Sequence, residues 1–229
     1  MAWGDAGRER AANMAERPGA QVDRMKNDTS RVLFHYWNAI RGSRRAPRRF
    51  EIEPARISRI LPEAFILEQR DVDTYRFRIA GTRLCELFGM ELRGHNFLEL
   101  WEDGDRFPVK RRLACVAEEG AVGLFEFEAS VSVRESASFE VLIVPLIQKD
   151  AAIDRFLGTM SPISEPLWRG VERLERCHLL RHELIWPEPA SGRIVRAPLP
   201  EVRDARLVRV AHRSFRVYEG GLSRETGKR

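Results

Sequence analysis

The chain has 229 residues, of which 43% are hydrophobic and 32% charged, and a formal net charge of +5. This length suits one domain of about 130 to 150 residues with extensions, and no apolar run approaches the roughly 18 residues of a membrane-spanning helix. The positive charge lies in residues 193–229, which hold 10 Lys+Arg against 4 Asp+Glu, so residues 1–192 carry a net charge of −1 and nucleic acid is an unlikely partner of the main domain.

The start of the chain predicts a cytoplasmic protein. Its first 21 residues lack the apolar core of a signal peptide. The three cysteines are scattered and odd in number, which is typical of free thiols in a reducing compartment. Residues 1–27 have few large apolar side chains, so we expect them to be disordered.

An amphipathic helix is predicted next, beginning at Asp28 or Thr29 and ending at Gly42. Leu33, Trp37 and Ile40 follow one another at i, i+4 and i+7 and share one face. Such a helix has two uses, to cover the outer face of a sheet or to pair with a second copy. We predict these three residues as partner contacts, in a homodimer or with a signalling protein.

A hairpin follows the helix. Residues Ala64–Glu68 are typical of a strand, and Tyr75, Phe77 and Ile79 alternate with arginines in the period of a half-buried strand. Asp71–Asp73 form the turn between them.

After Gly81 the apolar period changes to that of a helix, which we expect to be capped by the Thr82 hydroxyl and to end at Gly89. A second short helical run contains Phe97, Leu98 and Trp101. A strand that leads into several short helices is typical of a pocket wall.

The residue pattern of the rest of the domain predicts one longer helix and three strands. The helix is expected from Pro108 to Gly120. The strands are predicted within Phe125–Val133, Phe139–Leu146 and Phe156–Met160, joined by hairpins. The fold class is therefore α+β, with a five-stranded antiparallel sheet and short helices on one face.

These segments resemble an atypical PAS-domain family of proteobacteria. The resemblance is carried by LFHYWNAIRG, AGTRLCELFG and NFLELW, and continues through FEVLIVPL and DRFLGTMSP. It implies a PAS-like sheet curled around short helices and a sensor or adaptor role in bacterial signalling, by ligand or partner binding. We expect a PAS-like domain over residues 28–166 and a C-terminal extension over residues 167–229, and Met25 is a candidate natural start.

The family supplies no catalytic motif, so we expect no enzymatic activity, and the cofactor is unknown. Four residues are predicted to contact a small ligand: Arg83, Phe88, His95 and Trp101. Each has a plainer interpretation, in which Phe88 and Trp101 belong to the core, Arg83 is a surface charge and His95 lies in a loop.

Two further sets of residues are candidates for a functional role, one as a metal site and one as a pair of acids. Cys177, His178 and His182 lack a second ligand cluster for zinc, so we predict an ordinary edge strand or helix and no metal site. Glu126 and Glu128 are predicted on the solvated side of a strand.

The C-terminal tail has two open interpretations. Its arginines form a basic stripe if the tail is helical, which would bind nucleic acid or a membrane surface. The same residues also suit an extended strand.

Overall fold

The computed structural model describes residues 20–132, 135–148, 152–164, 173–187, 205–210 and 213–218. The chain divides into two units, residues 1–192 and residues 193–229. The first unit contains the domain that the sequence predicts.

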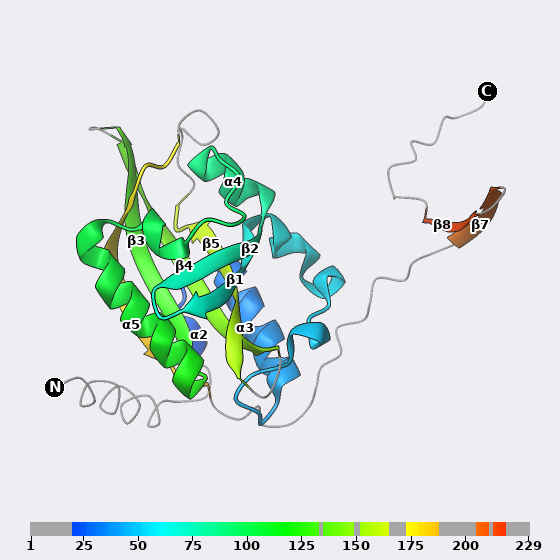
Figure 1. The fold of residues 1–229 in the computed structure, drawn as a ribbon, viewed down its shortest axis with the longest axis horizontal. Coiled ribbons are helices and arrows are strands. Elements are labelled where there is room, and N and C mark those ends of the chain that lie inside the picture. Colours follow the sequence, from blue (N-terminus) through cyan, green and yellow to red (C-terminus); the bar gives the residue numbers. More distant parts are fainter. Residues whose placement is uncertain are drawn as a thin grey trace. The chain divides into compact units, whose positions relative to one another are not determined.

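The first unit is built on a six-stranded antiparallel sheet with the order β2-β1-β5-β4-β3-β6 (Figure 1). The strands are β1 (Ala64–Asp71), β2 (Thr74–Ala80), β3 (Val122–Ser132), β4 (Glu135–Ile147), β5 (Ile153–Pro162) and β6 (Cys177–Ile185). The five predicted strands are confirmed, but the predicted count is one short. β6 pairs with the outer edge of β3, so the stretch from Cys177 to His182 is an edge strand.

The helices lie on the two faces of this sheet (Figure 1). They are α2 (Ala20–Asp23), α3 (Asp28–Arg41), the 3-10 helices η1 (Arg49–Glu51) and η2 (Pro54–Glu63), α4 (Thr82–Phe88), η3 (Phe97–Leu100) and α5 (Asp103–Glu119). In the figure α3 lies behind the sheet, while α4 and α5 lie in front of it. We call the α3 side the outer face and the α5 side the inner face.

Two predicted helix starts are wrong. The residue before α4 is Gly81, which makes no side-chain cap, and Thr82 is already helical. α5 begins at Asp103 rather than Pro108, because Asp103 and Asp105 place negative charge in the first turn, where the helix dipole favours it. The predicted ends at Gly42, Gly89 and Gly120 are confirmed as C-caps with positive φ.

The predicted disorder of residues 1–27 is wrong from residue 20 onward. α2 forms there, Gln21 donates to the Trp186 carbonyl at 2.9 Å, and the Met25 side chain is fully buried. Residues 1–19 lie outside the described residues. The segment before α3 packs on the sheet, where the Lys26 and Asn27 N–H groups donate to Glu140 of β4.

The second unit contains a two-stranded antiparallel hairpin of β7 (Ala205–Val210) and β8 (Arg213–Tyr218). Of the two interpretations of the tail, the extended one is therefore observed. Binding of nucleic acid or a membrane surface by this tail stays a prediction. Among the described residues of the whole chain, no helix has the length and apolar character needed to cross a membrane.

Gly81 offers a test of how tightly η2, β2 and α4 are joined. A Cβ atom built on Gly81 would lie 2.2 Å from the Pro62 carbonyl oxygen, whereas one built on Gly104 meets nothing within 4 Å. We expect Gly81→Ala to lower the free energy of unfolding by about 2 kcal/mol or more, because backbone atoms must move. Urea denaturation measures this change.

Gly104→Ala is the matched control for this substitution. Gly104 lies in the first turn of α5, where alanine is the better helix former, so we expect no loss or a gain below about 1 kcal/mol. Equal stabilities of the two variants would contradict the close contact at Gly81.

Candidate functional site

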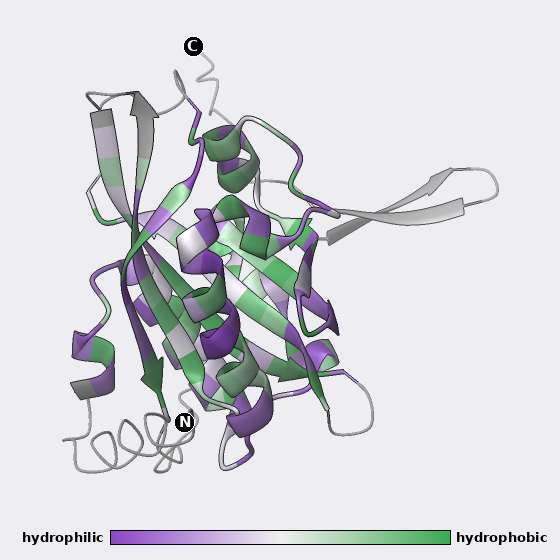
Figure 2. Cartoon of the chain, turned by 60° about the vertical axis from the view of Figure 1, so that its left-hand side comes forward, coloured by the Kyte–Doolittle hydropathy of each residue, from purple (hydrophilic) through white to green (hydrophobic). Residues whose placement is uncertain are grey.

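The inner face of the sheet is filled with aromatic rings. Trp101 is fully buried and contacts Phe97 and Phe127, with ring centroids 5.8 Å and 5.4 Å away. Phe127 stacks in turn on Phe139 at 5.1 Å. Figure 2 shows the hydrophobic residues gathered along the central strands. The space behind α4 and α5 is thus occupied by core side chains.

The four predicted ligand contacts are engaged separately in this structure. Trp101 and Phe88 are core residues, with exposed fractions of 0% and 6%. His95 is exposed, and its backbone carbonyl accepts a hydrogen bond from the Phe77 N–H at 3.0 Å. Arg83 forms an ion pair with Glu63 at 2.5 Å. Joint binding of a ligand by these residues stays a prediction, and it would require the packed rings to separate.

Two polar atoms of the inner core have no hydrogen-bond partner among the described residues. They are the Tyr75 hydroxyl and the Trp101 Nε1, both buried. Burial, with a smaller contribution from the Glu118 carboxylate, raises the pKa of Tyr75 to about 12. Tyr75 is therefore a neutral phenol at physiological pH.

The outer face, by contrast, holds four buried carboxylates, three of which lie around the start of α3. Glu63, Glu126 and Glu140 have exposed fractions of 7%, 6% and 0%. The prediction that Glu126 lies on a solvated strand face is wrong, because the chain's own N-terminal segment covers it. A buried carboxylate must be matched by donors or cations, so these three residues define where polar contacts form.

Glu140 binds the backbone that leads into α3. Its two carboxylate oxygens accept hydrogen bonds from the Lys26 N–H at 2.7 Å and the Asn27 N–H at 3.0 Å. Asn27 caps α3, with its side-chain oxygen accepting from the Thr29 N–H at 2.9 Å. The negative charge of Glu140 thus lies at the positive end of the α3 dipole.

Glu126 lies directly opposite Glu140 on the neighbouring strand. The Lys26 ammonium donates to Glu126 at 2.7 Å, and Arg181 of β6 lies 3.5 Å from it. These cations offset the repulsion of two adjacent carboxylates. Lys26 therefore contacts both acids, one through its backbone and the other through its side chain.

Glu63 connects α3 with α4 and β5. It accepts hydrogen bonds from Thr29 at 2.9 Å, from Ser161 at 2.6 Å and from Arg83 at 2.5 Å. Burial alone would raise the pKa of the Glu63 carboxyl, but these hydrogen bonds outweigh burial and leave the pKa below its ordinary value. Glu63 is ionised at neutral pH.

The apolar face of α3 packs on the same sheet surface. Leu33 and Trp37 are fully buried, Ile40 is partly buried, and the Trp37 indole N–H donates to the Pro145 carbonyl at 2.8 Å. Of the two uses predicted for this helix, covering the sheet is the one observed. Contact of Leu33, Trp37 and Ile40 with a partner stays a prediction, and it would require α3 to leave the sheet.

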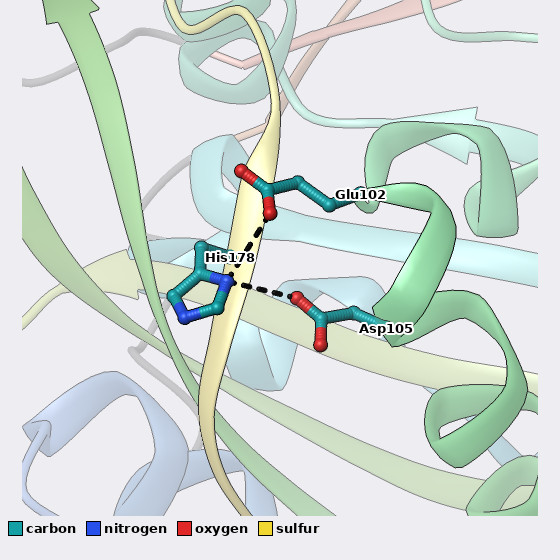
Figure 3. Close-up of side chains that lie close together, drawn as sticks. All are labelled: Glu102, Asp105 and His178. Atoms are coloured by element: carbon teal, nitrogen blue, oxygen red, sulfur yellow. Dashed lines mark hydrogen bonds and ion pairs between the residues drawn. The ribbon is translucent and has the colours of Figure 1, made fainter.

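A second polar cluster joins β6 to the start of α5. Figure 3 shows the His178 ring beside Glu102 and Asp105, with Nδ1 3.3 Å and 3.2 Å from their carboxylate oxygens. The ligand atoms of the three residues lie within 4.8 Å of one another. Asp105 also accepts from the Leu179 N–H at 2.8 Å. The cluster links an edge strand to a helix terminus.

The sequence groups His178 with Cys177 and His182, but in the structure its ring contacts Glu102 and Asp105. Cys177 is fully buried, and burial raises the pKa of its thiol, while the His182 ring accepts a hydrogen bond from Arg112 at 3.0 Å. Glu102 and Asp105 precede His178 by more than 70 residues, and the backbone contact of Glu102 with Cys177 at 3.1 Å brings them together. The spacing of the residues contained no signal of this cluster.

The outer-face arrangement can hold or release a helix. Its components are the three carboxylates, the backbone N–H groups before α3, and the buried Leu33 and Trp37.

Comparison with known proteins places the fold among PAS domains. A family model described as a PAS domain matches residues 25–161. The matched solved structures include a LOV protein of Rhodobacter sphaeroides, with 12% identity and a TM-score of 0.37 over 44% of this chain and 59% of that chain.

Two other matched structures are single PAS domains. One is the PAS domain of a protein from Colwellia psychrerythraea, with 13% identity and a TM-score of 0.35 over 46% of this chain and 92% of that chain. The other is the PAS domain of an HTR-like protein from Haloarcula marismortui, with 19% identity and a TM-score of 0.33 over 50% and 94%. No curated protein matches the chain.

The lowered pKa of Glu63 makes a pH-dependent prediction. A carboxyl whose folded-state pKa lies below its unfolded value stabilises the protein above the unfolded value, and that contribution is lost as pH falls through the folded value. Glu63→Gln should therefore cost about 1–3 kcal/mol of unfolding free energy at pH 7 and progressively less in acid. Urea denaturation at a series of pH values measures the difference.

Glu86→Gln is the control, because Glu86 is exposed on α4. It should leave stability unchanged at every pH. A Glu63→Gln deficit that stays constant from neutral to acid pH would contradict the charged state assigned to Glu63.

Proposed function

The chain belongs to the PAS-domain family, and we propose that it is a non-enzymatic regulatory protein of bacterial signalling that works by binding a small ligand or a protein partner. In this proposal α3 is the output element. Docked on the sheet, it hides Leu33 and Trp37, and on release it presents them to a signalling protein or to a second copy of the chain.

One observation carries the proposal: the start of α3 is attached to the sheet through a fully buried carboxylate. Glu140 accepts two backbone hydrogen bonds from Lys26 and Asn27. Hydrogen bonds to charged groups contribute about 1.5–3 kcal/mol each. A change of that size at Glu140 would alter the docked population of α3 by orders of magnitude.

The docked helix also explains why a partner would bind selectively. Trp37 is held by the Pro145 carbonyl and covered by the Arg41 guanidinium, 5.3 Å from the ring centroid. Burying a tryptophan of this kind stabilises a fold by about 3–5 kcal/mol relative to alanine. A partner must therefore offer an equivalent apolar groove, which favours a second PAS sheet or a dedicated signalling protein over non-specific surfaces.

The cellular setting in the proposal is the cytoplasm. Cys85, Cys115 and Cys177 are free thiols, which supports a reducing compartment. The association proposed is a homodimer or a complex with a signalling protein.

Glu140→Ala tests the role of α3. Removing the carboxylate leaves the Lys26 and Asn27 N–H groups without their acceptor, so hydrogen exchange of the α3 amides should accelerate by about tenfold or more while β4 and β5 stay protected. Native mass spectrometry of the full chain should then show an increased dimer fraction or an increased amount of retained partner.

Glu128→Ala is the control, because Glu128 lies on β3 and bonds Ser136 at 2.7 Å instead of the segment before α3. It should leave the exchange of α3 unchanged. The proposal fails if Glu140→Ala loosens α3 without changing association, or if the purified protein turns over a substrate.

A further inference from the structure

A cavity of about 480 Å³ lies on the outer face of the sheet beside β1 and β2. Ile66 of β1 lines it, and Ile66 alternates with Phe65 and Leu67, which are buried in the core. Ile79 of β2 pairs with Ile66 and adds a second apolar wall. This volume is in the range of small-molecule sites, which span about 300–1,000 Å³.

Four of the residues that line this cavity are arginines, namely Arg49, Arg78, Arg93 and Arg155, and none of its described lining residues is acidic. They come from four separate parts of the chain: η1, β2, the segment after α4, and β5. We call this cavity the arginine cavity. Four guanidinium groups around one hollow create a positive potential that attracts an anion.

Glu68 balances only part of the positive charge of the four cavity arginines. Arg155 binds Glu68 at 2.7 Å and also pairs with Asp154 at 3.0 Å, while Arg78 lies 3.5 Å from Glu68. Arg70, outside the cavity, also pairs with the same carboxylate at 3.0 Å. One buried carboxylate therefore already serves three arginines.

Arg49 and Arg93 have no side-chain hydrogen bond or ion pair to any described residue, yet the backbone around each is fixed. Residue 48 bridges to Ile147, whose N–H donates to the Pro47 carbonyl at 3.0 Å. Beside Arg93, the Gly94 N–H donates to the Phe77 carbonyl at 2.8 Å, with a φ of 90° that favours glycine. The backbone near both arginines is thus fixed, and their side chains line the cavity without an ion pair to a described carboxylate.

The chemistry of the lining selects a class of ligand. Guanidinium groups bind phosphate and carboxylate oxygens in bidentate fashion, and a phosphate offers more acceptor oxygens and more charge than one carboxylate. Gln148 adds an amide that can donate and accept, and the two isoleucines contact an apolar or planar group. An anion that carries an organic part matches both halves of the cavity.

We infer that the arginine cavity binds a small organic phosphate with two or more negative charges, of the size and charge of a nucleoside diphosphate. Arg49 and Arg93 are its main charge contacts, while Arg78 and Arg155 contribute from their positions beside Glu68. This site lies on the outer face, and it does not depend on the release of α3.

Isothermal titration calorimetry of the full chain tests the inference with ADP, pyrophosphate, citrate and adenosine as probes. ADP should bind more tightly than pyrophosphate because of the isoleucine walls, and adenosine should not bind. Added salt should weaken the binding of both phosphates. Arg49→Ala and Arg93→Ala should each weaken ADP binding by about tenfold or more, because each removes hydrogen bonds to a charged group.

Two further variants keep the test specific. Arg93→Lys retains the charge without the bidentate fork and should have an intermediate affinity. Arg176→Ala removes one exposed arginine before β6, the strand farthest from β2 in the sheet, and should bind ADP as the unmodified chain does. Urea denaturation confirms that each variant is folded.

Three results would overturn the inference. They are no binding of ADP or pyrophosphate, equal losses in Arg176→Ala and Arg93→Ala, and tighter binding of citrate than of either phosphate. The last result would identify a polycarboxylate site in place of a phosphate site.

Discussion

Buried negative charge on the outer face of the sheet is the constraint on which the rest of this structure depends. Glu63, Glu126 and Glu140 are all nearly or fully buried, and an ionised carboxylate without partners costs several kcal/mol in such a place. The segment before α3 supplies two backbone N–H groups and one ammonium group as partners, and Thr29 in the first turn of α3 supplies a hydroxyl. The position of α3 is therefore determined by charge as well as by its apolar face.

This constraint divides the sheet into two surfaces with different chemistry. The inner face packs aromatic rings against α4, η3 and α5, and it makes the domain stable. The outer face carries carboxylates under α3 and arginines beside β1 and β2. In a family whose members share this fold, the chemistry that distinguishes one chain from another is expected at the surface that carries the charges.

Much of the fold could be predicted from local pattern. The alternation through Phe125 and Phe127 and the continuous apolar run after Phe139 identified β3 and β4, because side-chain period follows directly from strand geometry. The start of α5 was misplaced, since Pro108 is a common but not a necessary first residue of a helix and acidic residues upstream competed with it. The sequence of β6 does not distinguish a strand from a helix, because a short edge strand has little periodicity of its own.

The candidate site was less predictable, because its contacts join residues that lie far apart in the sequence. Lys26 meets Glu126 and Glu140 across 100 and 114 residues of sequence, and no local pattern reports such distances. Glu126 is buried because the N-terminal segment packs over β3. The alternating pattern of β3 would be the same if that face were exposed to water. For the same reason the sequence marks Arg83 as a charged residue near a helix start but does not reveal its ion pair with Glu63.

The sequence by itself determined the α+β class, five strands, the amphipathic helix α3 and the PAS resemblance, because these rest on residue periods and short motifs. Only the tertiary structure decided which carboxylates lose their water, which arginines converge on one cavity, and that His178 lies between Glu102 and Asp105. Those outcomes depend on the order in which strands pair, and strand order joins residues whose separation along the chain carries no energetic signal until the sheet has formed.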